Sequence, residues 1–190
     1  MFVYFFSYLI LAVFFILERF VRRWDDTKNM DRTIHDKGST TFISIVMGMA
    51  FILLSISPLL NWFGIGALHH LGIGVTGLIL GTCGLVVRYL AFNTLGRFFS
   101  RTLREAENHT LVTCGIYKFV RHPGYLSDFL IFIGVALAMN SLIAIIAIPP
   151  TFIAAYTYRI YTEEKMLIGI FGEQYCRYQK TSKRLIPFIF

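Results

Sequence analysis

The chain has 190 residues, of which 56% are hydrophobic and only 15% are charged. A soluble domain carries about 25% charged residues, and a chain of this length cannot bury so large an apolar excess in its own core. The composition excludes an ordinary soluble protein and indicates one integral membrane domain over residues 1–190.

The formal net charge is +7. Its Lys and Arg residues are confined to short polar stretches between apolar runs, as in the loops of membrane proteins, so no nucleic-acid partner is expected. The three cysteines lie far apart in the sequence, without a CxxC pair. We therefore expect neither a metal site nor a disulfide framework.

Four apolar regions predict about five transmembrane helices. The first three, Met1–Phe20, Thr40–Leu60 and Leu68–Phe92, each have the length of one crossing, about 20 residues. The fourth, Pro123–Tyr161, has 39 residues and makes two crossings if the chain turns at Asn140–Ser141. The expected fold is an all-α, multi-pass membrane protein.

The positive charges predict the orientation. Residues 21–38 and 93–122 carry five Lys or Arg each, and more follow Tyr158, whereas residues 61–67 and the turn at 140–141 carry none. By the positive-inside rule, the two basic loops and the C-terminal tail are cytoplasmic and the N-terminus is outside. The tail is also amphipathic, and we expect it to fold back over the cytoplasmic loops.

A glycine pattern in the third span has two explanations. The run from Gly72 to Gly77 matches GxGxxG, but no strand precedes it, so a Rossmann domain is not expected. Gly74, Gly77, Gly81 and Gly84 share one helix face, which predicts close helix packing in the membrane.

Two charged residues, Arg88 and Asp128, lie inside apolar runs. A charge at membrane depth is costly, so we expect these two to be functional or paired with each other.

The segment Arg121–Tyr125 predicts a helix entrance at the membrane edge. Pro123 favours the first helical turn, which places His122 at the start of a helix and Tyr125 one turn in. The free N–H groups of that turn bind a carboxylate or a ring nitrogen. The alternative is an interfacial anchor of Arg, His and Tyr.

The end of the last span is also rich in polar residues. Arg159 and Glu163 are separated by four residues and share a helix face, with Tyr156 one turn earlier, while Glu164 points elsewhere. Acidic residues at the membrane edge need neutralisation, so a cationic ligand or the loop arginines are the expected partners. A weak surface ion pair is the alternative.

Six segments in order resemble the isoprenylcysteine carboxyl methyltransferase family, over Leu103 to Phe190. They are His109-Thr110-Leu111-Val112-Thr113, Gly115-Ile116-Tyr117, Arg121-His122-Pro123-x-Tyr125, Glu163-Glu164-x-x-Leu167, Phe171-Gly172-x-x-Tyr175-x-x-Tyr178 and Pro187-Phe188-Ile189. Ser127 departs from the family, which often has Gly at that position.

The resemblance implies a multi-pass methyltransferase that uses S-adenosylmethionine, releases S-adenosylhomocysteine and needs no metal. Residues 1–92 then supply three spans, and residues 93–190 form the catalytic half. The implied catalytic residues are Arg159, Glu163 and Glu164. The implied cofactor-binding residues are His109, Thr110, Leu111, Val112, Tyr117, His122, Pro123, Gly124, Tyr125 and Glu163.

These roles lead to a specific hypothesis. Glu163 pairs with the ammonium of the cofactor, the helix entrance and Tyr117 hold the nucleoside, and Arg159 orients an anionic acceptor. The expected acceptor is the carboxylate of an isoprenylcysteine-like amphiphile that enters a monomeric protein from the bilayer. A carboxylate needs no general base, whereas an amine would need one, with Glu164 or His122 as the candidate.

Three alternatives remain at this point. One is a phospholipid N-methyltransferase, and another is an enzyme similar to the membrane sterol reductases that would bind NADPH. The third is a non-enzymatic scaffold or transporter built on the glycine face, Arg88 and Asp128, although no inverted repeat is evident.

Overall fold

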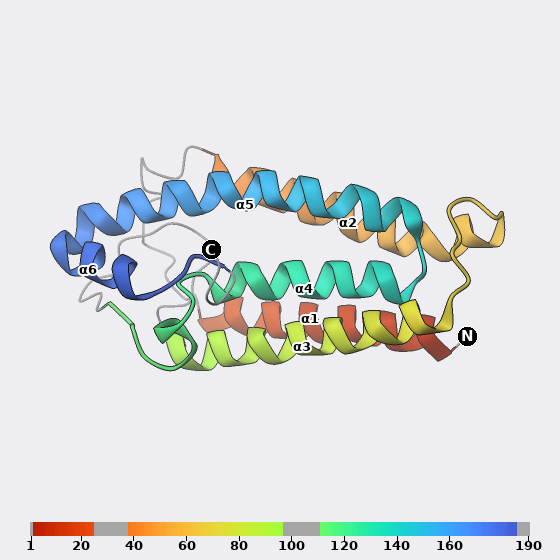
Figure 1. Ribbon diagram of the computed structural model, residues 1–190, viewed down its shortest axis with the longest axis horizontal. Coiled ribbons are helices and arrows are strands. Elements are labelled where there is room, and N and C mark those ends of the chain that lie inside the picture. The colour runs from red at the N-terminus through yellow and green to blue at the C-terminus, as the bar shows by residue number, and fades with distance from the viewer. Residues whose placement is uncertain (1, 25–37, 97–110, 186–190) are drawn as a thin grey trace.

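The computed structural model describes residues 2–24, 38–96 and 111–185, and this part of the chain is helical with no strand. Two isolated bridges, Ala67 with Ser141 and Val120 with Lys183, are its only β-type pairings. The elements in chain order are α1 (Phe2–Trp24), α2 (Ser39–Trp62), α3 (Leu71–Leu95), the 3-10 helix η2 (Gly115–Lys118), α4 (Pro123–Ala138), α5 (Leu142–Phe171) and α6 (Glu173–Thr181) (Figure 1).

The long helices agree with the predicted membrane spans. Of the described helices, α1, α2, α3 and α5 are long and apolar enough to cross a bilayer, and α4 is a shorter apolar helix of 16 residues. Large apolar side chains such as Phe5, Ile52 and Ile79 are exposed on their outer faces, where lipid would cover them. The predicted all-α, multi-pass membrane fold is confirmed.

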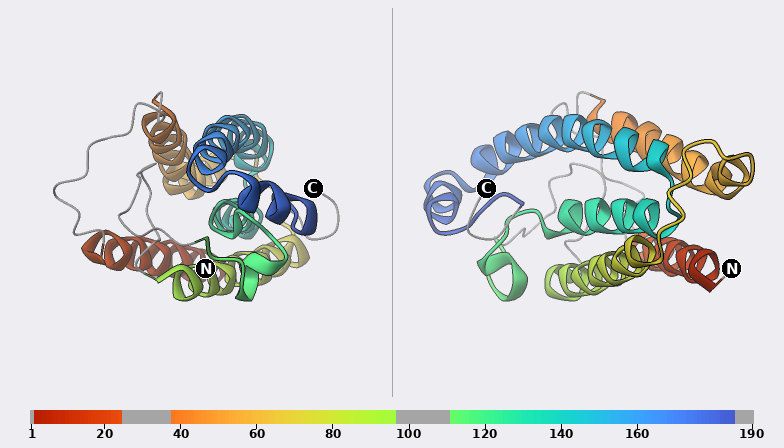
Figure 2. Two further views of the ribbon diagram at one scale, coloured as in Figure 1. Left: turned by 90° about the vertical axis from the view of Figure 1, so that its left-hand side faces the viewer. Right: turned by 45° about the vertical axis from the view of Figure 1, so that its right-hand side comes forward.

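The shortness of α4 is explained by its position in the centre of the bundle. Its 16 residues rise about 24 Å, less than the hydrocarbon thickness of about 30 Å. It packs against α1, α2, α3 and α5 (Figure 2). Its residues Ile131, Phe132 and Val135 are fully buried. Because α4 is enclosed by the other helices, it holds the N-terminal residues of its first turn in the interior of the protein.

A glycine seam joins α3 and α4. A Cβ atom at Gly77 would lie 2.2 Å from the Ala138 nitrogen, and one at Gly134 would lie 2.4 Å from the Gly81 nitrogen. Only glycine permits so close a backbone approach. The predicted packing role of the glycine face is therefore confirmed, and the seam fixes the register of the two helices.

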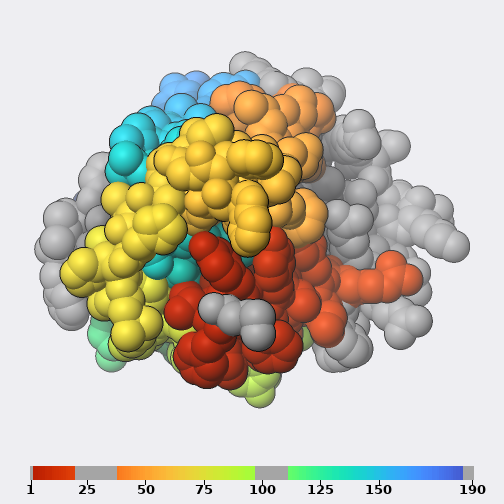
Figure 3. Space-filling model, turned by 90° about the vertical axis from the view of Figure 1, so that its right-hand side faces the viewer, coloured from red at the N-terminus to blue at the C-terminus, as the bar shows by residue number. Residues whose placement is uncertain are grey.

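The predicted turn between the last two long helices is also confirmed, at the end of the bundle opposite α6. Asn140 has a positive φ of 52°, and the Ser141 side chain caps α5 by accepting from the Ala144 nitrogen. The segment after α2 lies against this turn, because the Leu142 nitrogen donates to the Gly66 carbonyl at 2.8 Å. Figure 3 views this end, with the segment in yellow and gold beside the red atoms of α1.

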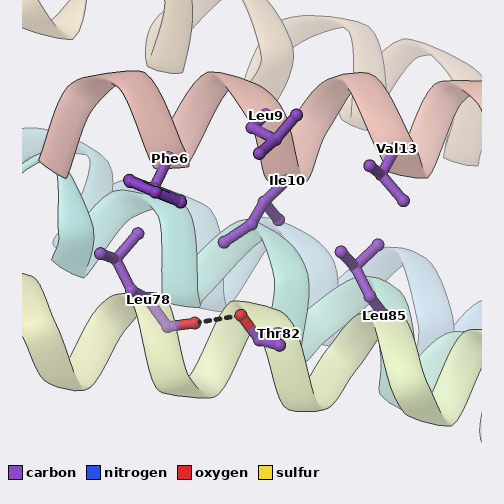
Figure 4. Close-up of a pocket in the computed structure, with 7 residues that line it drawn as sticks. All are labelled: Phe6, Leu9, Ile10, Val13, Leu78, Thr82 and Leu85. Atoms are coloured by element: carbon purple, nitrogen blue, oxygen red, sulfur yellow. Dashed lines mark hydrogen bonds between the residues drawn. The ribbon is translucent and has the colours of Figure 1, made fainter. Parts of the chain in front are cut away.

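A shallow apolar hollow of about 190 Å³ lies between α1 and α3 (Figure 4). Its one polar side chain, Thr82, donates its hydroxyl to the Leu78 carbonyl at 2.8 Å and so offers no free donor. The lining residues are Phe6, Leu9, Ile10, Val13, Leu78, Thr82 and Leu85. The hollow shares no residue with the predicted site.

Candidate active site

The start of α4 has the geometry that its sequence predicts. His122 is the N-cap residue, Pro123 occupies the first turn, and both are buried. The His122 side chain makes no capping hydrogen bond, so it leaves the N–H groups of the first turn without a side-chain acceptor of its own. This helix entrance lies at the end of the bundle that carries α6 (Figure 1).

The Tyr125 hydroxyl joins the predicted residues of α4 and α5. It donates to Glu163 Oε2 at 2.6 Å and accepts from Arg159 Nε at 3.0 Å. The Tyr125 ring stacks near the His122 ring at 5.7 Å and near the Tyr156 ring at 5.1 Å. Arg159 and Glu163, predicted to share a face, therefore meet at one phenol, and the Glu163 side chain remains 25% exposed.

Arg159 is buried and is held by a third helix. Its Nη1 donates to Ser39 Oγ at 2.7 Å and to Thr40 Oγ1 at 3.0 Å, both in the first turn of α2. Sequence reasoning missed these two residues because they lie about 120 positions away along the chain. The only indication in the sequence is that Ser39 and Thr40 are polar residues at the start of an otherwise apolar run.

Glu164 approaches the same His122 ring as Glu163, through the other ring nitrogen, and is the centre of an ion cluster. Its Oε1 accepts from Arg121 Nε at 2.9 Å and lies 3.4 Å from His122 Nε2, while its Oε2 accepts from Arg184 Nε at 3.2 Å. The predicted pairing with a loop arginine is confirmed for Arg121. Arg184 is a further partner that the sequence did not indicate.

The segment after α6 folds back onto the residues that precede α4. The Arg121 nitrogen donates to the Lys183 carbonyl at 2.7 Å, and the His122 nitrogen donates to the Arg184 carbonyl at 3.1 Å. Arg121 Nη1 also donates to the carbonyl oxygens of Gln179 and Ser182. The tail therefore closes over the helix entrance, as its amphipathic sequence predicts.

Three buried tyrosines lie in the elements next to this tail, Tyr117 in η2 and Tyr175 and Tyr178 in α6. The Tyr178 hydroxyl donates to the Tyr117 carbonyl at 2.5 Å, which ties α6 to η2. Burial raises the pKa of Tyr178 to about 12 and raises the pKa values of Tyr117 and Tyr175 well above the ordinary value. All three phenols are neutral at physiological pH and remain hydrogen-bond donors.

The remaining predicted residues lie around this entrance or outside the described residues. Leu111 and Val112 are half-buried on the chain that leads into η2, while His109 and Thr110 lie outside the described part of the chain. The Gly124 carbonyl is within hydrogen-bond distance of Arg88 Nη1, at 3.2 Å. The structure therefore brings together Tyr117, His122, Pro123, Gly124, Tyr125, Arg159, Glu163 and Glu164 at one end of the bundle.

The groups at the entrance fit a ligand that carries both charges and an aromatic ring. The partly exposed Glu163 carboxylate suits a cation, and the uncapped turn of α4 suits an anion or a ring nitrogen. The buried Tyr175 hydroxyl has no hydrogen-bond partner within the described residues. Nowhere in residues 2–24, 38–96 and 111–185 do three His, Cys, Asp or Glu side chains gather as metal ligands.

Comparisons with known proteins point in one direction. A model of the isoprenylcysteine carboxyl methyltransferase (ICMT) family matches residues 76–169. Protein-S-isoprenylcysteine O-methyltransferase B of Arabidopsis thaliana is 31% identical over 164 residues, with 82% of this chain and 83% of that protein covered. The O-methyltransferase of Tribolium castaneum is 39% identical over 137 residues, with 66% of this chain and 45% of that protein covered.

The fold agrees with a solved structure as well. The eukaryotic intramembrane Ras methyltransferase ICMT, solved without a monobody, has a TM-score of 0.61 and 31% identity, with 77% of this chain and 52% of that chain covered. The chain thus spans about half the length of the solved protein and of the Tribolium relative. Because both sequence and fold agree with these proteins, the chain belongs to the isoprenylcysteine carboxyl methyltransferase family.

Proposed function

We propose that this chain is an integral membrane methyltransferase. It transfers a methyl group from S-adenosylmethionine to the carboxylate of an amphiphilic, isoprenylcysteine-like acceptor. The observation that carries the proposal is the meeting of Glu163 and Arg159 at the Tyr125 hydroxyl, beside the uncapped start of α4. A carboxylate and a guanidinium at one phenol suit two ligands of opposite charge. The relatives are named as isoprenylcysteine O-methyltransferases, which supports the same chemistry.

The chemistry is an in-line displacement at a methyl carbon. The bound cofactor supplies an electrophilic methyl group on a sulfonium. The acceptor oxygen forms the new bond to carbon while the carbon–sulfur bond breaks, and the electron pair stays on sulfur. A carboxylate acceptor gives up no proton, so the protein has to align the ligands and exclude water.

The cofactor side of the site rests on α4, α5 and the tail. Glu163 accepts the hydrogen bonds of an ammonium group with the part of its carboxylate that Tyr125 leaves open. The first turn of α4 donates backbone N–H groups, and Tyr117 adds an aromatic face beneath the tail. Glu164 has both oxygens engaged by Arg121 and Arg184, so we assign it to holding the tail.

The acceptor side rests on Arg159. Its guanidinium is fixed by Ser39 and Thr40 of α2 and by Tyr125 of α4, so its direction is set before a ligand arrives. A carboxylate beside Arg159 sits between helices whose outer faces are apolar, which suits entry of an amphiphile from the bilayer. The expected monomer remains a proposal.

The same end of the bundle is the proposed cytoplasmic face. The described helix ends that flank the basic stretches at residues 21–38 and 93–122 lie at this end, as does α6, which belongs to the basic region beyond Tyr158 (Figure 1). Residues 61–67 at the other end carry no Lys or Arg. The positive-inside rule supports a cytoplasmic site and tail and an N-terminus on the opposite side.

Binding of S-adenosylhomocysteine by the detergent-solubilised protein tests the proposal. We expect calorimetric binding in the micromolar range, with NADPH giving no signal. Glu163→Gln removes the charge that faces the ammonium and is expected to weaken binding by about tenfold or more, as for loss of a charged hydrogen bond. Glu173→Gln is the matched control, because Glu173 is an exposed glutamate in the first turn of α6.

The outcomes separate the proposal from its rivals. Binding that is weakened by Glu163→Gln and unchanged by Glu173→Gln supports the cofactor assignment and leads to acceptor assays with a prenylated cysteine and with a phospholipid amine. A folded, monodisperse protein that binds only NADPH, or neither ligand, overturns it.

A further inference from the structure

A buried ion cluster lies next to the helix entrance, on the side away from the tail. Arg88 of α3 pairs with Glu18 of α1 and with Asp128 of α4, and the Arg88 Nη1 to Asp128 Oδ1 distance is 2.9 Å. All three side chains are only 4–5% exposed. The pairing of Arg88 with Asp128 confirms one of the two sequence-based expectations for these residues.

The glycine seam places Arg88 where it is. Gly77, Gly81, Gly84, Arg88 and Ala91 form the buried face of α3. The close backbone approach at the glycines fixes α3 against α4, and Arg88 follows Gly84 by four residues on the same face. The packing of α3 on α4 therefore sets the position of the Arg88 side chain along α4, next to the start of that helix.

Arg88 contacts the first two turns of α4 through three groups, of which Gly124 lies in the first turn. Its Nη1 lies 3.2 Å from the Gly124 carbonyl oxygen, 3.4 Å from Ser127 Oγ and 2.9 Å from Asp128 Oδ1. Ser127 Oγ in turn donates to the Gly124 carbonyl at 2.6 Å. The Gly124 carbonyl in the helix entrance is thus held by two donors.

A second line of contacts runs from Asp128 to Glu163. Asp128 Oδ2 accepts from the Tyr156 hydroxyl at 3.1 Å. The Tyr156 ring stacks on the Tyr125 ring at 5.1 Å with an interplanar angle of 22°. The Tyr125 hydroxyl then holds Glu163 Oε2 at 2.6 Å. Asp128 is therefore linked, through Tyr156, to Tyr125 of α4 and to Glu163 of α5, which both belong to the proposed cofactor site.

We propose that Arg88 and Asp128 are positioning residues for the cofactor site: the guanidinium fixes the first turn of α4, and the carboxylate fixes Tyr156 and through it Tyr125. Neither residue touches the ligand. The inference rests on the proposed function of the helix entrance. Arginine suits this place because its planar fork donates in two directions, to α1 and to α4, which the point charge of lysine does not.

The cluster offers a matched pair of variants. Glu18→Gln and Asp128→Asn each remove one buried carboxylate charge from the same guanidinium, at almost equal burial. Glu18 belongs to α1, which supplies none of the groups described at the helix entrance, whereas Asp128 faces Tyr156. If the cluster only joined helices, the two variants would behave alike.

The test measures stability and geometry on the purified full chain in detergent. We expect both variants to lower the melting temperature. We expect Asp128→Asn alone to weaken S-adenosylhomocysteine binding, by about tenfold, as for small misplacements of a site. The His122 resonance in spectra of histidine-labelled protein reports the entrance without any ligand, and it should shift in Asp128→Asn and stay unchanged in Glu18→Gln.

Each outcome decides the matter. Equal effects of the two variants on binding and on the His122 resonance, or no effect of Asp128→Asn on either, overturn the inference. If the parent protein binds no S-adenosylhomocysteine, the proposed function fails, and the His122 resonance still tests the positioning role. Tyr156→Phe, which removes one hydroxyl, replaces Asp128→Asn if that variant does not fold, with a smaller shift expected in the same direction.

Discussion

Two ion clusters flank the proposed site, and they differ in composition and in exposure. The inner cluster, Glu18, Arg88 and Asp128, sets two carboxylates around one guanidinium, and its side chains are 4–5% exposed. The tail cluster, Arg121, Glu164 and Arg184, sets two guanidiniums around one carboxylate, and its Arg184 side chain is 43% exposed.

The difference predicts that the side of the site next to the inner cluster is fixed and that the side next to the tail cluster can open. The inner cluster joins α1, α3 and α4 beside a seam where the backbones touch, so its geometry is set by the whole bundle. The tail cluster joins Glu164 of α5 to Arg121, which precedes α4, and to Arg184, which follows α6. The ion pair of Glu164 with Arg184 is accessible to solvent. A solvent-accessible ion pair is screened and weak, whereas a broken buried one is expensive. We therefore expect the cofactor to enter and leave at the tail side.

Arg88→Met is expected to have the largest effect on stability. The substitution removes a positive charge between two buried carboxylates, a class of change that destabilises proteins by about 3–5 kcal/mol. Unfolding of the purified protein in mixed detergent micelles measures the loss. A loss of less than about 1 kcal/mol, typical of surface ion pairs, would show that the inner cluster is no more rigid than the tail cluster.

Gly134→Ala tests the seam that supports the inner cluster. A Cβ atom there lies 2.4 Å from the Gly81 nitrogen, so α3 and α4 have to separate, at a cost of about 1–3 kcal/mol for overpacking. Gly48→Ala is the control, because a Cβ atom at Gly48 meets nothing within 4 Å among the described residues. Equal stability of the two variants in the same micelle assay would argue against a rigid seam.

The sequence predicts the membrane helices well because the physical signal is local. The apolar runs, the turn at Asn140–Ser141 and the shared face of Arg159 and Glu163 all depend on neighbours within a few residues. The glycine face also predicted close packing, although it did not name α4 as the partner. Lipid imposes these patterns directly, since each crossing has to satisfy its own backbone.

The sequence did not predict which distant residues complete the site. Ser39 and Thr40 hold Arg159 from another helix, and Arg184 joins Glu164 from the tail. Glu18 lies near the end of an apolar run and gave no sign that it faces Arg88. Such partners depend on how the helices are arranged in the bundle, which periodicity in a single chain does not encode. The assignments of Glu163, Arg159 and the α4 entrance to ligand binding remain predictions.

Two buried tyrosines of α6 allow a finer test of the tail side. Tyr178→Phe removes a hydrogen bond to the Tyr117 carbonyl and is expected to destabilise the protein by about 1 kcal/mol. The Tyr175 hydroxyl has no hydrogen-bond partner in the described parts of the chain, so Tyr175→Phe is expected to leave the free energy of unfolding nearly unchanged. If that hydroxyl serves the ligand, only Tyr175→Phe weakens binding of S-adenosylhomocysteine beyond what its stability explains.

Only a small effect on stability is expected for Arg184→Met. Glu164 keeps Arg121 and His122 as partners, and the lost pair is partly exposed, so the cost is less than about 1 kcal/mol. The backbone pairing of Arg184 with His122 does not depend on the side chain and should persist.

Local opening of the tail should nevertheless increase in the Arg184→Met variant, because the ion pair between Arg184 and Glu164 of α5 is lost. Hydrogen exchange of residues 173–185 measures it, and Lys183→Met is the control, since it removes the same charge from the exposed neighbouring side chain. Faster exchange in Arg184→Met alone supports a tail that opens at this ion pair. Unchanged exchange, or a loss of stability as large as that of Arg88→Met, would contradict this. The tail cluster would then be as fixed as the inner cluster, and the cofactor would reach the site by another route.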